Sequence, residues 1–306
     1  ADLVLVVFGV SVVVFLLMRM IPGDAVAIML GANTEITPER LASLRARFGL
    51  DRPVLAQYLD WAAAALSGDL GTSLWTGRPV AEEIAAHAGV TLQLLAMSLA
   101  LGAALAVPAG CAMARVRGGA ADVALRVATI AGITVPSFWL GIVMILAAAS
   151  LAPGFPAVGH VPFAQDPVGN LQRMALPTLA LGLPILASLS RLVRTAMLDA
   201  LGQDYVRTAR AKGLAERRVV YRHALRNALL PFVTSVGMTA GYLFGGAIVV
   251  EQVFALPGIG RLVLGAISER NYPLVQATIL MVTVGFVVVN FAVDMLYAAI
   301  DPRVRR

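Results

Sequence analysis

Residues Asp204–Pro231 read DYVRTARAKGLAERRVVYRHALRNALLP and form a polar segment inside an apolar chain. The segment holds seven lysine and arginine side chains and two acidic ones, whereas the chain of 306 residues is 59% hydrophobic and 14% charged, with a mean hydropathy of +0.82. A soluble domain typically carries about 25% charged residues. The composition therefore predicts an integral membrane protein. A single cysteine excludes a disulfide framework and a cysteine-based zinc site.

Six apolar runs are long enough to cross a bilayer, for which a helix needs about 20 residues. They cover residues 3–21, 89–114, 123–151, 175–198, 229–250 and 275–300. Helices are expected because each satisfies its own backbone hydrogen bonds in lipid, and the alternating segments of a barrel are missing. The first run ends in RMIPGDA, which does not resemble a signal-peptide cleavage site, so we expect it to be retained as a span. The basic flank that usually precedes such a span is missing, so we expect native residues before Ala1.

The distribution of lysine and arginine predicts the orientation of the spans. With the N-terminus in the cytoplasm, the cytoplasmic loops 115–126, 191–226 and 303–306 hold 15 of the 24 basic residues. The long segment 22–88 holds five basic and eight acidic residues and is placed outside. Both termini are then cytoplasmic, and the net charge of +6 is explained by topology rather than by nucleic-acid binding.

The predicted organisation has four parts. They are the first transmembrane helix (1–21), a periplasmic helical segment (22–88), a five-helix transmembrane core with a cytoplasmic loop at 199–230 (89–300), and a cytoplasmic tail (301–306). Within the second part, 37–49 and 53–66 carry helix start and stop signals. In the latter helix an apolar stripe is formed by Leu55, Leu59, Ala62 and Leu66. These amphipathic helices either rest on the membrane or receive a soluble partner.

Helix breakers and small residues mark three spans as candidates for the substrate path. Pro136 lies in the third span and Pro184 in the fourth, and broken helices often line a path through a membrane. Gly237, Gly241 and Gly245 recur every four residues in the fifth span, which places them on one helical face. That face serves either helix packing or the path and the subunit boundary.

The polar segment is too long for a simple turn and has the pattern of two helices. Val206, Ala209 and Leu214 share one face of the first helix, and Gly213 interrupts it. A second helix is predicted over Ala215–Leu229. Such a helix–glycine–helix element suits docking into a groove of a soluble partner, and its charge equally suits anionic lipid headgroups.

The same segment resembles the cytoplasmic EAA loop of ABC importer permeases, specifically their dipeptide/oligopeptide branch. With Gly213 aligned, Ala209 and Leu225 also match the motif, whereas Arg207 stands in place of its glutamate. A salt bridge made by that glutamate therefore cannot be transferred to this chain. The resemblance extends along the chain through IPGD (21–24), GDLGTSL (68–74), VPSFWLG (135–141), VEQVFALPGIGRL (250–262), RNYPLVQ (270–276) and DMLYAAIDPRVR (294–305).

The resemblance implies the six-helix fold of a type I ABC importer permease in a bacterial inner membrane. It implies a heterodimer with a second, homologous permease, two cytoplasmic ATPase subunits that bind ATP and magnesium, and a periplasmic or lipid-anchored binding protein that delivers short peptides. The expected coupling residues are Arg207, Ala209, Gly213, Leu214, Glu216 and Leu225.

The sequence contains no motif that supports an enzymatic function. The only lysine is Lys212, so a P-loop for ATP is missing, and we expect no catalytic site, bound cofactor or metal in this chain. HExxH and nucleophile-elbow motifs are also missing. A nickel or glutathione permease of the same family remains as an alternative, as does an ATP-independent carrier, which the lack of mid-membrane carboxylates disfavours.

Overall fold

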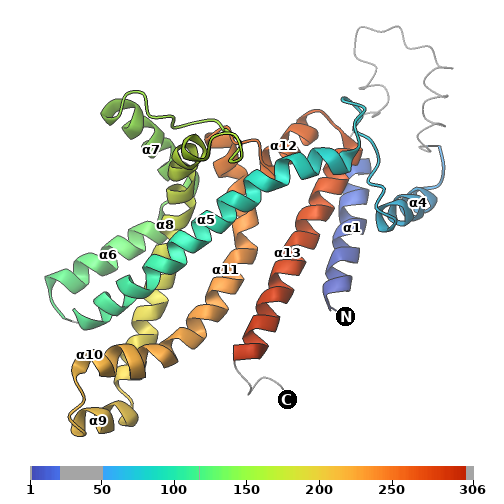
Figure 1. Cartoon of the computed structure of the whole chain (residues 1–306). Coiled ribbons are helices and arrows are strands. Elements are labelled where there is room, and N and C mark those ends of the chain that lie inside the picture. Colours follow the sequence, from blue (N-terminus) through green and yellow to red (C-terminus); the bar gives the residue numbers. More distant parts are fainter. Residues whose placement is uncertain (1, 21–50, 117, 301–306) are drawn as a thin grey trace. The chain divides into compact units, whose positions relative to one another are not determined.

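The computed structural model describes residues 2–20, 51–116 and 118–300, and these residues form helices and their connections (Figure 1). The long helices are α1 (Asp2–Met20), α5 (Val80–Arg115), α8 (Pro167–Leu201), α11 (Leu225–Val253) and α13 (Tyr272–Ile300). The shorter ones are α4 (Val54–Leu66), α6 (Ala120–Thr134), α7 (Ser137–Leu151), α9 (Asp204–Ala211), α10 (Glu216–Arg218), the π-helical η1 (Val219–Ala224) and α12 (Ile259–Ser268). Among the described residues the all-helical prediction is confirmed.

The chain forms two compact units. The first contains residues 1–90 and 257–287, and the second contains residues 91–256 and 288–306. The first unit thus holds α1, α4, α12 and the adjoining parts of α5 and α13. The second holds the helices from α6 to α11 and the remaining parts of α5 and α13.

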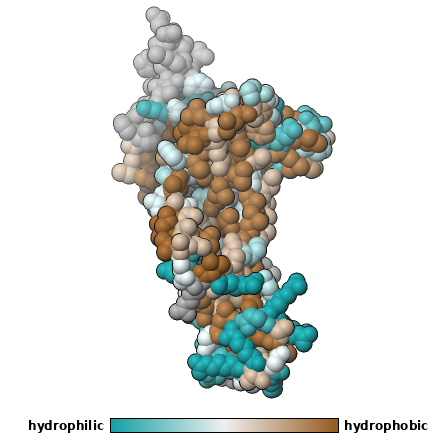
Figure 2. All heavy atoms as spheres, turned by 90° about the vertical axis from the view of Figure 1, so that its left-hand side faces the viewer, coloured by the Kyte–Doolittle hydropathy of each residue, from teal (hydrophilic) through white to brown (hydrophobic). Residues whose placement is uncertain are grey.

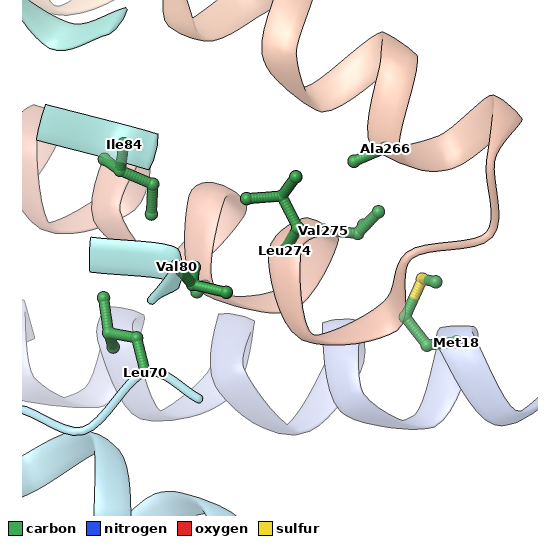
Figure 3. Packing of buried hydrophobic residues seen from close by; sticks show 8 residues of the cluster. Met18, Leu70, Val80, Ile84, Ala266, Leu274 and Val275 are labelled. Carbon is green, nitrogen blue, oxygen red and sulfur yellow. The ribbon is translucent and has the colours of Figure 1, made fainter. Parts of the chain in front are cut away.

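The first unit is built around a small apolar core, shown in Figure 3. Met18 of α1 packs with Leu70, which lies between α4 and α5, and with Val80 at the start of α5. Leu274 and Val275 of α13 complete this group. Polar contacts fix the loop over this core. The side chain of Asn271 accepts from the Leu74 amide at 3.2 Å and donates to Ser73 Oγ at 2.8 Å. The start of α5 is therefore held to the start of α13.

The second unit is organised around α8, which packs against α6, α7 and α11. Its N-terminus is capped by Asp166, whose carboxylate accepts from the Gly169 amide at 2.9 Å. Pro177 and Pro184 lie inside this helix and do not end it. The fourth predicted span is thus one continuous helix. Packing within a membrane protein allows a helix to continue past the lost hydrogen bonds.

The third predicted span, 123–151, is not one helix. α6 ends at Thr134, α7 begins at Ser137, and the two helices are bent by 102°. Pro136 explains the position of the break, because its ring disfavours helical backbone at Val135 and it lacks an amide proton. Val135 accordingly has an extended backbone, with ψ of 123°.

Among the described residues, five helices are long and apolar enough to cross a membrane, and six spans result if the bent pair counts as one. The five segments are Leu3–Met20, Val80–Arg115, Pro167–Leu201, Pro231–Val253 and Tyr272–Val293. These are the predicted spans with shifted ends, in agreement with the permease fold. The predicted helix at 37–49 and the tail 301–306 lie outside the described residues, and the four-part organisation stays a prediction.

Candidate functional site

The polar segment folds as a short helix closed over a small apolar cluster. α9 buries Val206 and Ala209, which contact the buried Val219 of η1. Leu201, at the end of α8, and Leu214 pack against the same cluster. Because the apolar side chains recur at helical spacing, α9 turns one face inward and leaves its basic face to solvent.

Gly213 forms the turn that follows α9. Its φ of +75° lies in the left-handed region, which a residue with a Cβ adopts only at a cost. The Gly213 amide donates to the Arg210 carbonyl at 2.9 Å, and the Leu214 amide donates to the Ala209 carbonyl at 3.3 Å. These two bonds satisfy carbonyls at the helix end, as in a Schellman motif. A Cβ at position 213 would meet no atom within 4 Å, so backbone conformation alone favours glycine here.

Arg210 and Glu216 form a two-point ion pair across this turn. Arg210 Nη2 lies 2.6 Å from Glu216 Oε1, and Arg210 Nε lies 3.1 Å from Glu216 Oε2. The hydrogen bond from Arg210 lowers the pKa of Glu216, and the same bond raises the pKa of Arg210. Because both side chains are about half exposed, water screens the pair, and we assign it about 0.2–1 kcal/mol. Its main effect is to fix the angle at which the chain leaves α9.

The second helix of the predicted pair is not separate from the following span. α10 passes into the π-helical turn η1 and then into α11 without a break, so the helix boundary predicted near Leu229 is wrong. Pro231 lies inside α11 and does not interrupt it. Asn227 Nδ2, near the start of α11, donates to Tyr205 Oη of α9 at 2.8 Å. A side-chain hydrogen bond therefore joins α9 to a helix that is long and apolar enough to span a membrane.

The structure brings four of the six expected coupling residues together around the turn that follows α9, and leaves Arg207 and Leu225 apart from them. Ala209 and Leu214 belong to the apolar cluster, and Gly213 and Glu216 form the turn beside it. Arg207 is exposed and pairs with Asp204 at 3.3 Å, away from the cluster. Leu225 lies at the start of α11, outside the cluster. Figure 2 shows hydrophilic residues gathered at the end of the second unit where Figure 1 places α9 and α10.

Arg210 was not among the residues singled out from the sequence. The signal that identifies it is a pair of opposite charges placed three residues before and three residues after the turn glycine. Tyr205 and Asn227 gave no such signal, because their contact depends on how α9 folds back on α11.

A buried carboxylate joins α6 to α8 near the ends of these helices. Asp122 is buried and accepts from Arg126 and from Arg194, the latter at 3.0 Å. The Gly118 amide also donates to it, at 3.2 Å. Since Arg194 is itself largely buried, the two side chains neutralise each other within the protein.

A groove of about 390 Å³ lies between α8 and α11. It is lined by Ser188, Leu189, Arg191, Leu192 and Thr195 of α8 and by Ser235, Met238, Thr239 and Tyr242 of α11. All these residues fall within segments that are long and apolar enough to span a membrane. The Thr195 and Thr239 hydroxyls donate to the Arg191 and Ser235 carbonyls of their own helices. The guanidinium of Arg191 is costly against lipid, so the groove is expected to face water or protein.

The residues predicted to serve either helix packing or the path do not line this groove. Gly237 lies against Val293 of α13, where a Cβ would overlap the valine side chain, so it serves helix packing. Gly241 is buried, whereas Gly245 is exposed and has no atom within 4 Å of a built Cβ. Pro136 lies at the α6–α7 break, and Pro184 is half-buried in α8.

Sequence analysis missed the groove, although a signal for it exists. Ser188, Arg191 and Thr195 recur at a spacing of three to four residues, as do Ser235, Thr239 and Tyr242. It also missed Glu251, a fully buried carboxylate at the end of α11 that accepts from Thr91 Oγ1 at 2.5 Å.

Comparison with known proteins identifies the family. Residues 106–306 match the model of the binding-protein-dependent transport system inner membrane component. Residues 1–94 match the model of the N-terminal part of such membrane components. Together the two matches cover nearly the whole chain.

Curated relatives are similar over their full length. A putative peptide transport system permease protein of Brucella abortus (strain 2308) is 38% identical over 305 residues, covering 100% of this chain and 96% of the relative. The dipeptide transport system permease protein DppB of Escherichia coli K12 is 37% identical, covering 97% and 94%. The glutathione transport system permease protein GsiC of Escherichia coli O6:H1 is 39% identical, also covering 97% and 94%. The chain therefore belongs to the binding-protein-dependent inner membrane permeases, as a multi-pass ABC importer permease of the dipeptide/oligopeptide family.

Proposed function

We propose that this chain imports short peptides as one of two homologous permeases in an ATP-driven, binding-protein-dependent complex. Two cytoplasmic ATPase subunits would bind ATP and magnesium, and a periplasmic or lipid-anchored protein would deliver the peptide. The N- and C-termini would lie in the cytoplasm. The observation that carries the proposal is the loop from α9 to α11, in a chain whose full-length relatives are named peptide permeases.

The loop would couple ATP binding to the membrane helices. The exposed basic face of α9 and the turn at Gly213 offer a compact surface to an ATPase groove. The Arg210–Glu216 pair and the Tyr205–Asn227 contact join that surface to α11. A push on α9 would thus move α11, and ATP would shift the transporter between inward- and outward-facing states only as far as it binds one state better.

The groove between α8 and α11 would form part of the peptide path. A short peptide carries a carboxylate at one end and amide groups along its backbone. Arg191 supplies a cation for the carboxylate, and the hydroxyls of Thr195 and Ser235 supply polar contacts. Met238 and Tyr242 tolerate varied side chains because they are large, adaptable and exposed.

A second candidate substrate is glutathione, because one relative of equal similarity is named a glutathione permease. Glutathione is a peptide-like anion, so the same groove chemistry would accept it. Nickel has no comparable support, since the described residues contain no group of three or more histidine, cysteine and acidic side chains placed to hold a metal ion.

The test is uptake by the complete complex in proteoliposomes. Labelled dipeptides, longer peptides, glutathione and nickel would be supplied with the binding protein, with and without ATP. We expect ATP-dependent uptake of one peptide class. Uptake that persists without ATP or without the ATPase subunits would identify a carrier and overturn the proposal.

A further inference from the structure

α4 packs against α1 within the first unit, through contacts that extend from Phe8 to Arg19. Tyr58 Oη lies 2.9 Å from Ser11 Oγ, and the Tyr58 ring meets the Phe15 ring edge-on, with 5.2 Å between centroids. Trp61 also packs on Phe15, at 5.8 Å. The aromatic contacts therefore centre on Phe15, five residues before α1 ends at Met20.

This contact fixes the depth of α4. At 1.5 Å per residue, Phe15 lies about 7.5 Å before the end of α1 along the helix axis. Because the apolar spanning window of α1 is Leu3–Met20, α4 contacts α1 about that far inside this window, counted from Met20. Amphipathic helices that lie in a membrane interface are buried by about 5–10 Å. The depth of α4 falls within this range.

Two neighbouring residues fix how α4 is rolled about its own axis. Gln57 accepts from Arg19 Nη2 at 2.7 Å, near the end of α1. Tyr58 reaches the other way along α1, to Ser11 and to Phe8. Because consecutive residues contact points so far apart along α1, α4 crosses α1 steeply. The side of α4 that carries Tyr58 points toward the middle of the membrane, and the side that carries Gln57 points out of it.

In this orientation, the leucine stripe lies on the side of α4 that faces the membrane. If Trp61 marks the face toward α1, the direction into the membrane lies about 90° around α4, on the side of Tyr58. At about 100° per residue, Leu55, Leu59 and Leu66 fall within about 70° of that direction, whereas Asp60 lies about 170° away from it. Asp60 is exposed and pairs with Arg52, so charge occupies the opposite side.

The stripe is also the most exposed apolar surface of α4. Leu66, Leu55 and Leu59 are 90%, 70% and 57% exposed. The face of α1 opposite α4 leaves Val13 and Leu17 exposed, as expected of a helix that faces lipid. We propose that α4 is an interfacial membrane helix whose leucine stripe (Leu55, Leu59 and Leu66) inserts among lipid acyl chains. It would thereby brace the end of α1 instead of docking a soluble protein.

Spin labels on opposite sides of α4 test this placement. Leu59→Cys and its matched control Asp60→Cys would be made in a background in which the only native cysteine, the buried Cys111, is replaced by alanine. The labelled permease complex would be reconstituted in phosphatidylethanolamine–phosphatidylglycerol vesicles. Relaxation by oxygen, which concentrates in lipid, would be compared with relaxation by a water-soluble nickel chelate.

We expect the label at position 59 to respond severalfold more to oxygen than to the nickel chelate, and the label at position 60 to show the reverse. Equal access of the nickel chelate to both labels would overturn the proposal. The proposal would also be overturned if the label at position 59 is accessible to the nickel chelate in vesicles and loses this access when the binding protein is added. That result would identify a protein-docking face. Leu66→Cys repeats the measurement if Leu59→Cys does not assemble.

Discussion

Arg210 and Glu216 are joined across the turn at Gly213 by two nearly parallel hydrogen bonds, of 2.6 and 3.1 Å. The glutamate expected at the start of the family motif is replaced by Arg207, which pairs only with the exposed Asp204. The loop of this chain is thus held by a different ion pair, placed after the motif's first element. A family relationship therefore does not transfer this contact, because the charges around the turn differ from those of the motif.

Glu216→Gln is expected to lower ATP-dependent uptake while costing only about 0.2–1 kcal/mol of stability, because the exposed pair orients the loop more than it stabilises it. Uptake and Tm of the reconstituted complex measure the two effects. The charge-swapped double variant R210E/E216R should recover part of the uptake. Glu82→Gln, which breaks the similarly exposed pair with Arg78, is the matched control and should leave uptake unchanged. Equal uptake in Glu216→Gln and wild type would contradict a role for the pair.

The pair also predicts a pH dependence of stability. Because the folded pKa of Glu216 lies below the ordinary value of 4.5, its stabilisation is complete above that value and is lost as the pH falls through the folded pKa. The Tm difference between wild type and Glu216→Gln should therefore stay constant from about pH 8 to about pH 5.5 and vanish in more acidic buffer. A difference that grows on acidification would have the wrong sign.

At Gly213 the backbone conformation, and not space, limits substitution. Gly213→Ala should destabilise the loop by about 1 kcal/mol, whereas Gly213→Asn should cost less because asparagine tolerates positive φ. Uptake is expected to fall in the order Gly, Asn, Ala. Initial uptake rates at equal protein incorporation provide the measurement. An alanine variant more active than the asparagine variant would show that side-chain chemistry matters more than φ.

Arg191 is expected to recognise the carboxylate of a peptide in the groove between α8 and α11. Arg191→Gln should reduce uptake of peptides with a free C-terminus more than uptake of the same peptides with an amidated C-terminus. The ratio of the two uptake rates, compared between wild type and variant, separates recognition from general loss of activity. An unchanged ratio would remove Arg191 from the proposed path.

Asp122 should be needed for a stable α6–α8 contact. Asp122→Asn removes a carboxylate that faces Arg126 and Arg194, and it leaves the largely buried Arg194 without its charged partner. We expect a lower Tm and reduced yield of the single variant in detergent. The double variant D122N/R194M should restore part of the Tm, because it removes both charges. A double variant no more stable than the single one would argue against the pairing as the cause.

Much of the fold could be predicted because membrane spans are long, apolar and bounded by charge. The bend at Val135 and Pro136 shows the limit of such prediction. A largely apolar run of 29 residues, 123–151, suggests one span, and only packing decides how far a proline bends it. In the loop from α9 to α11, the spacing of apolar residues predicted that Ala209 and Leu214 share one face, and both belong to the apolar cluster. The continuation of η1 into α11 could not be foreseen, because the polar segment and the apolar span were expected to form two helices that meet near Leu229.

The groove was less predictable than the loop. Its surface depends on which faces of α8 and α11 meet, and a spacing of three to four residues does not fix the partner helix. The glycines of α11 illustrate this, because Gly237 meets Val293 whereas Gly245, eight residues later, is exposed.

ATP hydrolysis and peptide uptake measured in the same vesicles, for Gly213→Pro and wild type, give the most direct test of coupling through this loop. Proline fixes φ near −65° and removes the amide that bonds to Arg210, so the turn cannot form. We expect the variant complex to assemble and to hydrolyse ATP, with uptake lost and hydrolysis no longer stimulated by the loaded binding protein. Uptake at the wild-type rate by an assembled Gly213→Pro complex would show that the loop does not transmit the action of ATP.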